Sequence, residues 1–138
     1  SVGYKTGSIS PYEYQLDLAN VLGTLGFQLL LSGTSEEILF RALPITFLIS
    51  LNTAENKKNY LFEIFIASLL FSVAHISWTI FPFTLSFSWF QLIYAFILGI
   101  AYGITYVKSK NVIYPMIMHG ISNFFMVGIG YIFMLIME

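Results

Sequence analysis

The sequence predicts an all-α protein, a polytopic transmembrane helix bundle with about four membrane helices. Hydrophobic residues make up 57% of the chain and charged residues only 9%, whereas a soluble domain carries about 25% charged residues. The mean hydropathy is +0.79, and several apolar runs reach the roughly 20 residues that a membrane helix needs. We therefore expect the lipid bilayer to be a partner of the whole chain.

The remaining composition excludes several classes of protein. A net charge of −1 provides no basic surface for nucleic acid. The absence of cysteine excludes disulfides and thiolate chemistry. The chain starts at Ser1 without a charged leader, so we expect an N-terminally truncated core that lacks earlier helices. Residues 1–10 are predicted to be a linker or truncated end, and residues 11–138 a single membrane domain.

The first helical region is longer than a membrane is thick. Ser10-Pro11-Tyr12-Glu13 predicts a capping box at its start. The apolar run Leu16–Leu51 would form a helix of about 54 Å, against a hydrocarbon core of about 30 Å. It must therefore bend or break, and Ser32-Gly33-Thr34 and Pro44 are the places that favour this. We expect one kinked helix, and a hairpin at residues 32–34 stays possible.

The rest of the chain alternates between apolar helices and short connections. Tyr60–Ser77 is predicted as the second helix, after a hydrophilic loop at Asn52–Asn59. An uncharged aromatic loop, Trp78–Ser88, leads to the third helix, Trp89–Lys108. The last helix is predicted at Val112–Met137, after a short turn.

Two features of the second and third helices are predicted to be structural. Gly99 and Gly103 have the spacing that lets a neighbouring helix backbone approach closely. Glu63 lies near the lysine-rich end of the second helix, where we expect it to be solvated or interfacial.

The lysines predict the orientation in the membrane. If the helices alternate in direction, four lysines lie in loops on one side, which the positive-inside rule makes cytoplasmic. These are Lys57, Lys58, Lys108 and Lys110. The chain is rich in Asn, Lys, Ile and Phe, which suggests an AT-rich bacterial source and hence a bacterial cell membrane.

A charged motif, Glu36-Glu37-Ile38-Leu39-Phe40-Arg41, interrupts the apolar run of the first helix. Ionisable groups at membrane depth cost about 2.5–3.5 kcal/mol each, so they persist mainly where they pair or do chemistry. Glu37 and Arg41 are four residues apart and predict an ion pair. Glu36 points about 100° away from Glu37, and an acid outside that pair suits a general base.

Both histidines of the chain also lie in apolar helices. His119 and Asn123 are four residues apart and project from one face of the last helix. His75 follows Phe71 at the same spacing in the second helix. Each histidine alone is also compatible with a hydrogen-bonded packing role. The hypothesis of a shared site rests on Glu36, His75, His119 and Asn123 occurring together on three otherwise apolar helices.

These three motifs together resemble those of the CPBP family, the CAAX proteases and bacteriocin-processing enzymes. Glu36–Arg41 is similar to the EExxxR motif, Phe71–His75 to FxxxH and His119–Asn123 to HxxxN. The motifs occur in the family's order, and the resemblance covers about residues 20–125. It implies a type II CAAX prenyl endopeptidase-like core, a glutamate-type intramembrane protease that has more helices than this chain.

The resemblance implies a role for each motif residue. Glu36 would be the general base that takes a proton from the attacking water, and His75 would help to hold that water. His119 and Asn123 would stabilise the oxyanion, while Glu37, Arg41 and Phe71 would support the motif. No cofactor is implied, although Glu36, His75 and His119 could instead bind Zn²⁺ with a water as fourth ligand.

The expected activity is therefore hydrolysis of a peptide bond within the membrane. The substrate is expected to be a lipidated CAAX-type peptide or a bacteriocin or leader peptide. Two alternatives stay open: a non-catalytic scaffold or immunity protein that binds a partner, and a zinc-dependent intramembrane protease.

Overall fold

The computed structural model describes residues 16–51 and 59–137. The predicted linker at residues 1–10, the capping box at residues 10–13, and Lys57 and Lys58 lie outside the described residues. The chain forms two compact units, which are described separately. Unit 1 combines the chain up to Ser35 with the chain from Met116 onward, and unit 2 runs from Glu36 to Pro115.

The all-α prediction is confirmed, and the described residues include two helices that are long and apolar enough to cross a membrane. These are Trp89–Ser109 and Ile113–Ile136, judged by length and composition. A third apolar helix, Leu61–Val73, is shorter. The predicted bounds of the two long helices were correct to within one residue.

The first helical region runs without reversal from Leu18 to Leu51, so the prediction of one helix is confirmed and the hairpin alternative is wrong. Two π-helical segments interrupt it rather than a turn at Ser32-Gly33-Thr34 or a break at Pro44. Its consecutive segments are α2 (Leu18–Phe27), η1 (Gln28–Ser32), α3 (Gly33–Glu37), η2 (Ile38–Ala42) and α4 (Leu43–Leu51). Pro44 is buried within α4.

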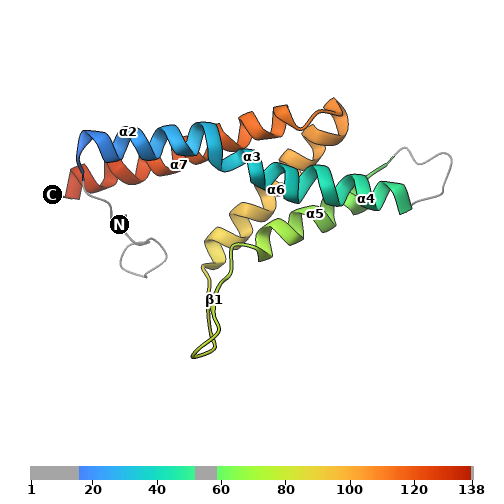
Figure 1. Ribbon diagram of the computed structural model, residues 1–138, viewed down its shortest axis with the longest axis horizontal. Helices are drawn as coiled ribbons and strands as arrows, with labels where there is room; N and C mark the ends of the chain where they lie inside the picture. Colours follow the sequence, from blue (N-terminus) through green and yellow to red (C-terminus); the bar gives the residue numbers. More distant parts are fainter. Residues whose placement is uncertain (1–15, 52–58, 138) are drawn as a thin grey trace. The chain divides into compact units, whose positions relative to one another are not determined.

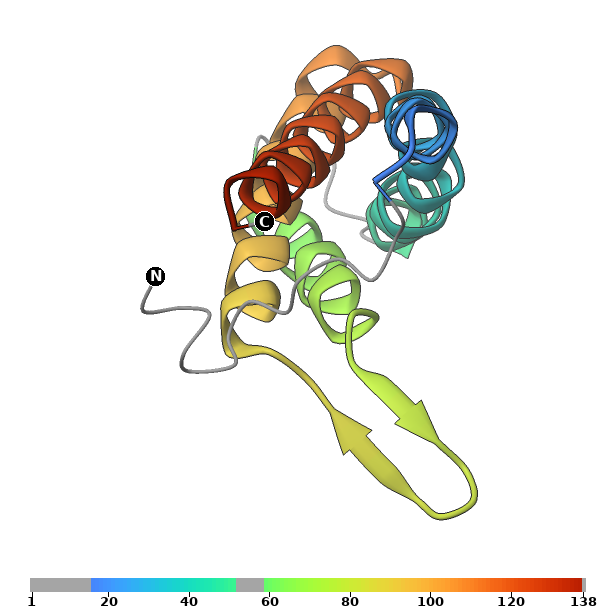
Figure 2. The same ribbon diagram turned by 90° about the vertical axis from the view of Figure 1, so that its left-hand side faces the viewer.

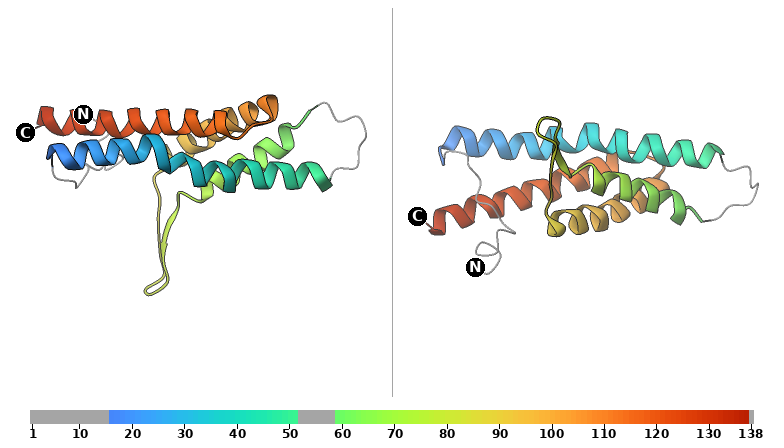
Figure 3. Two further views of the ribbon diagram at one scale, coloured as in Figure 1. Left: turned by 45° about the horizontal axis from the view of Figure 1, so that its top comes forward. Right: turned by 90° about the horizontal axis from the view of Figure 1, so that it is seen from below.

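Unit 1 pairs α2 and η1 with the part of α7 (Ile113–Met137) that follows Pro115. The two helical segments lie side by side and run antiparallel, as Figures 1 and 3 show. The contacts agree with the antiparallel arrangement. Leu25 approaches Gly128, whereas Leu29, which follows Leu25 in the chain, meets Gly120, which precedes Gly128. Unit 1 is thus a pair of packed apolar helices.

Unit 2 places α5 (Leu61–Val73) between the η2–α4 segment and α6 (Trp89–Ser109), as Figures 2 and 3 show. Its core contains Ile45 from α4 with Ile64 and Ala67 from α5. The hydroxyl of Thr46 on α4 also bonds the hydroxyl of Tyr106 on α6, at 2.9 Å. Apolar burial and this polar contact hold the three segments of unit 2 together.

Small residues bring α5 and α6 close together, as the sequence predicted. A Cβ on Gly103 would lie 2.8 Å from Cγ2 of Ile64, and one on Gly99 would lie 3.0 Å from Cβ of Ser68. Farther along, the hydroxyl of Ser72 donates to the carbonyl of Leu92 at 2.8 Å. The packing role of the two glycines is therefore confirmed.

Three expectations for unit 2 were wrong. The second helix ends at Val73, not Ser77, and the aromatic stretch forms a hairpin of two antiparallel strands, β1 (Ser77–Thr79) and β2 (Thr84–Ser86), instead of a loop. Glu63 is not solvated, because only 1% of its surface is exposed in α5. The hairpin has a cause in the sequence: apolar and hydroxyl residues alternate through this stretch, which is the strand period.

Candidate functional site

The three motifs are divided between the two units. Glu36–Arg41 and Phe71–His75 lie in unit 2, and His119–Asn123 lies in unit 1. The structure brings together residues within each of these sets. The convergence of Glu36 and His75 with His119 and Asn123 stays a prediction.

Glu37 and Arg41 form the predicted ion pair in the interior of unit 2. Nε of Arg41 lies 3.4 Å from a carboxylate oxygen of Glu37, and both side chains are fully buried. The guanidinium group also lies over the ring of Phe71, at 4.2 Å from its centroid, and 5.5 Å from that of Tyr102. Ring faces attract a cation, so α5 and α6 both help to hold Arg41 in place.

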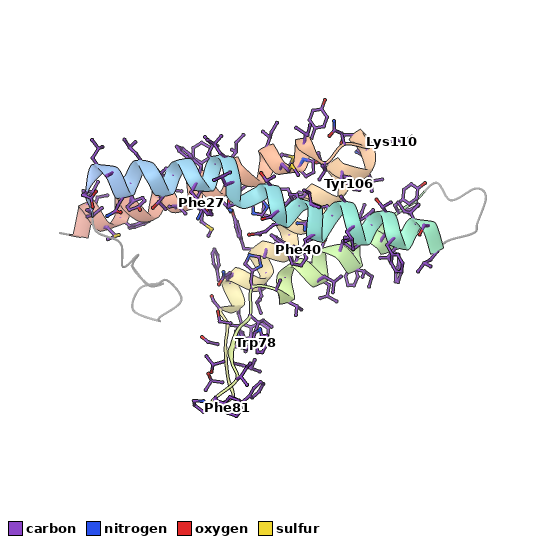
Figure 4. All side chains as sticks on the ribbon, viewed as in Figure 1. Phe27, Phe40, Trp78, Phe81, Tyr106 and Lys110 are labelled. Atoms are coloured by element: carbon purple, nitrogen blue, oxygen red, sulfur yellow. The ribbon has the colours of Figure 1, made fainter. Side chains whose placement is uncertain are left out.

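Phe71 connects the first motif to the second. Besides Arg41, its buried ring contacts Phe40 edge to face at 5.6 Å and His75 at 4.8 Å between ring centroids. Phe40, labelled in Figure 4, belongs to the first motif and extends from η2. Aromatic pairs at these distances contribute about 0.5–1.5 kcal/mol beyond their burial. Phe71 therefore fixes the position of the His75 ring relative to the first motif.

The backbone determines which nitrogen of His75 carries the proton. Nδ1 lies 2.8 Å from the carbonyl oxygen of Phe71. A carbonyl oxygen can only accept, so Nδ1 must be the protonated nitrogen of this contact. The neutral ring then carries its lone pair on Nε2. A half-buried imidazole in this form can accept a proton or a hydrogen bond from water, or bind a metal.

Glu36 lies in α3, the short α-helical segment between the two π-helical segments. Its side chain is half-buried, whereas the neighbouring Glu37 is fully buried. π-helical turns inside α-helices occur frequently at functional sites. Their presence on both sides of Glu36 distinguishes this part of the helix from its regular ends.

In unit 1, glycines allow the third motif to pack tightly against the first helical region. A Cβ on Gly33 would lie 3.0 Å from Cβ of His119. A Cβ on Gly120 would overlap the carbonyl oxygen of Leu29 and lie 3.1 Å from its carbonyl carbon. His119 is accordingly buried, with 4% of its surface exposed. The two backbones approach as closely as they do because neither position carries a side chain.

A chain of hydrogen bonds orients Asn123. Its Nδ2 donates to the hydroxyl oxygen of Ser32 at 3.0 Å, and that hydroxyl donates to the carbonyl of Gln28 at 2.8 Å. Because Ser32 has a single hydroxyl hydrogen and gives it to Gln28, the group facing Ser32 must be a donor. The amide nitrogen of Asn123 therefore faces Ser32 and keeps a second N–H for another acceptor.

Sequence reasoning missed four residues that support these motifs. Ser32, Gly33 and Gly120 position the third motif, and Tyr102 lies beside Arg41. Gly120 directly follows His119, and a glycine next to a candidate site residue was the available signal. Ser32 and Tyr102 gave no such signal, because each acts on a motif that is far away in the sequence.

The metal-binding alternative involves both units. Within each unit, the described residues contain no group of three or more His, Cys, Asp or Glu side chains arranged for a metal ion. The set considered for zinc takes Glu36 and His75 from unit 2 and His119 from unit 1. It therefore stays untested.

Comparison with known proteins identifies one family. The model of a family described as "Type II CAAX prenyl endopeptidase Rce1-like" matches residues 18–125, a segment that contains all three motifs. No curated protein and no solved structure matches the chain.

Proposed function

Since the chain belongs to the type II CAAX prenyl endopeptidase Rce1-like family, we propose that it is an intramembrane endopeptidase in which Glu36 activates water. The family and the apolar helices make it an integral membrane protein of a peptidase family. The observation that carries the proposal is that one family match spans Glu36–Arg41, Phe71–His75 and His119–Asn123 in order.

The proposed reaction is addition of water to the scissile carbonyl. Glu36 takes a proton from the water as its oxygen bonds to the carbonyl carbon, and the carbonyl oxygen becomes an oxyanion. The proton then passes to the amide nitrogen, the C–N bond breaks, and an amine and a carboxylic acid leave. In these steps the atoms and protons balance with water as the only co-reactant.

The local geometry supports the remaining roles. Nε2 of His75, which bears the lone pair, can accept a hydrogen bond from the water while Glu36 takes its other proton. Asn123 retains one N–H beyond the bond to Ser32, which can stabilise the oxyanion together with His119. Glu37, Arg41 and Phe71 are assigned to support, because Glu37 pairs with Arg41 and the guanidinium of Arg41 lies over the ring of Phe71, which contacts the ring of His75.

The substrate and the orientation are part of the proposal. A lipidated CAAX-type peptide or a bacteriocin or leader peptide is the expected substrate, in a bacterial cell membrane. The loops with Lys57, Lys58, Lys108 and Lys110 would face the cytoplasm. A cleavage assay with a panel of lipidated and leader peptides would identify the class.

The direct test replaces Glu36 by glutamine, which keeps its shape but removes the base. We expect Glu36→Gln to lower cleavage by about 10²–10⁴-fold without changing the thermal unfolding temperature. Asp17→Asn is the matched control, because Asp17 is an exposed N-cap and asparagine caps helices equally well. Wild-type turnover by Glu36→Gln would refute the assigned role.

Two further measurements separate the alternatives. If a chelator abolishes cleavage and Zn²⁺ restores it, the protein is a zinc-dependent protease and the proposed metal-free reaction is wrong. If the wild type cuts no peptide of the panel, and wild type and His119→Ala capture the same membrane partner equally well, the scaffold or immunity function is favoured.

A further inference from the structure

The β1–β2 hairpin has two chemically different faces. The register pairs Trp78 with Leu85, while Ser77 pairs with Ser86 and Thr79 with Thr84. Side chains alternate between the faces of a strand, so Trp78 and Leu85 share one face and the hydroxyl pairs share the other. The hydroxyls of Thr79 and Thr84 are in fact bonded at 2.7 Å. The alternation continues beyond the ends of the strands, where Ile80 follows β1 and Phe83 and Phe87 flank β2.

The apolar side chains of this hairpin are exposed and have no charged neighbours in sequence. Exposure reaches 92% at Phe81, 71% at Phe83 and 64% at Trp78. No Asp, Glu, Lys or Arg occurs between residues 64 and 107. An exposed apolar patch of this kind marks an interaction site with a protein, a ligand or a membrane. Figure 4 labels Trp78 near the base of the hairpin and Phe81 at its tip.

The length of α6 indicates which environment the hairpin meets. Its 21 residues span about 31 Å, which matches a hydrocarbon core of about 30 Å. Lys108 and Lys110 lie at the C-terminal end of α6, and the hairpin joins its N-terminal end (Figure 2). The hairpin therefore begins at the membrane boundary opposite these lysines.

The tryptophans indicate the same depth. The chain contains two, Trp78 and Trp89, and both lie at this end of unit 2. Tryptophan is enriched where the hydrocarbon core meets the headgroups, because its ring is apolar and its N–H is polar. The ring of Phe87 contacts that of Trp89 at 5.1 Å, which extends the aromatic surface from the hairpin to α6.

The backbone sets a limit on how deep the hairpin can lie. A two-stranded sheet has open edges, and lipid-exposed open edges do not occur within the hydrocarbon region. The hydroxyl face also favours contact with water. We propose that the hairpin lies flat in the headgroup layer opposite Lys108 and Lys110, with Trp78, Phe83 and Leu85 in the acyl boundary and the Ser/Thr face toward water.

The first test uses the fluorescence of Trp78 in the full chain reconstituted into phosphatidylcholine vesicles. Trp89→Phe leaves Trp78 as the sole tryptophan. We expect lipids brominated near the headgroup to quench it more strongly than lipids brominated near the chain end, and aqueous acrylamide to quench it weakly. Strong acrylamide quenching with no effect of brominated lipid would overturn the proposal.

The second test compares the two faces at neighbouring positions. The chain has no native cysteine, so Leu85→Cys and Thr84→Cys each provide a single labelling site. In vesicles we expect a membrane-impermeant maleimide to label Thr84→Cys and to spare Leu85→Cys, while both react in unfolding detergent. Equal labelling in vesicles would refute the two-faced arrangement.

A third outcome would identify a different occupant. If Leu85→Cys is labelled in vesicles and becomes protected only when a peptide from the cleavage panel is added, the apolar face binds substrate instead of lipid. The proposal needs only that the chain spans the membrane. Glu36→Gln should therefore give the same labelling as the native sequence even if cleavage is lost.

Discussion

The molecule uses the same device, glycine at a helix contact, in two regions with different consequences. In unit 2, Gly99 and Gly103 on α6 pack against Ser68 and Ile64 of α5. In unit 1, Gly120 on α7 packs against the backbone of Leu29 in η1, and Gly33 packs against His119. The first contact joins two segments of a core, whereas the second lies directly beside a candidate site motif.

The two contacts also differ in the atoms that a new side chain would meet. Next to Gly103 the nearest atoms all belong to the side chain of Ile64, which can adjust or be trimmed, whereas a Cβ on Gly99 would meet Cβ and the backbone Cα of Ser68. Next to Gly120 the nearest atom is a carbonyl oxygen, so the helices themselves would have to move. A substitution at Gly103 should therefore be tolerated at some cost in stability, and a substitution at Gly120 should not.

The largest effect is expected for Gly120→Ala. The added methyl overlaps the carbonyl of Leu29, so α7 must shift and carry His119 and Asn123 with it. A misplacement of about 1 Å can cost about 10²-fold in rate, and we expect cleavage to fall at least that far. The unfolding temperature should fall as well. Cleavage assays and thermal unfolding of the same preparations provide the measurement, and unchanged cleavage would show that this contact does not position the motif.

A smaller effect, on stability alone, is expected for Gly103→Ala. The new Cβ meets Cγ2 of Ile64 at 2.8 Å, and overpacking of this kind costs about 1–3 kcal/mol. Cleavage per folded molecule should stay at the wild-type level. Ile64→Ala removes the contacted methyl, so the double variant should be more stable than the sum of the single effects predicts. Additive effects would contradict direct contact.

The difference between the two contacts also explains why the sequence predicted the α5–α6 contact and not the contact in unit 1. Gly99 and Gly103 form a repeat within one helix, which sequence spacing displays directly. The contact in unit 1 combines Gly33 of α3 with Gly120 of α7, and no spacing rule links residues from two distant segments. The same limit applies to Ser32, whose bond to Asn123 crosses most of the chain.

The fold was predictable where one local signal dominated. Long apolar runs, such as those of α6 and α7, were predicted to within one residue. The hairpin was missed because the uncharged aromatic composition of residues 78–88 was interpreted as a loop, although apolar and hydroxyl residues alternate there with the period of a strand. The burial of Glu63 was missed because carboxylates near a predicted loop are mostly exposed. The tertiary contacts that bury this one cannot be read from the sequence.

Ser32→Ala tests whether the hydrogen bond between Ser32 and Asn123 positions the Asn123 amide. Removing the hydroxyl takes away the acceptor of the Asn123 amide, so its orientation is no longer fixed. We expect a loss of about 1 kcal/mol in stability and a lower kcat with little change in KM. Ser122→Ala is the matched control, since the hydroxyl of Ser122 donates to the carbonyl of Met118 within α7. Equal kcat values for the two variants would argue against a positioning role for Ser32.

The smallest effect, with the opposite sign, is expected for Gly128→Ala, two turns beyond Gly120 in α7. Here a new Cβ would meet Cδ2 of Leu25 at 3.9 Å, an ordinary van der Waals contact. Alanine is favoured over glycine within a helix by about 0.5–1 kcal/mol, so the variant should unfold at a slightly higher temperature and cleave normally. The pair Gly120→Ala and Gly128→Ala makes the same chemical change in one helix, and differs in what the new methyl meets. If both variants lost cleavage equally, α7 would be sensitive to alanine along its length, and the close approach at Leu29 would not explain the loss.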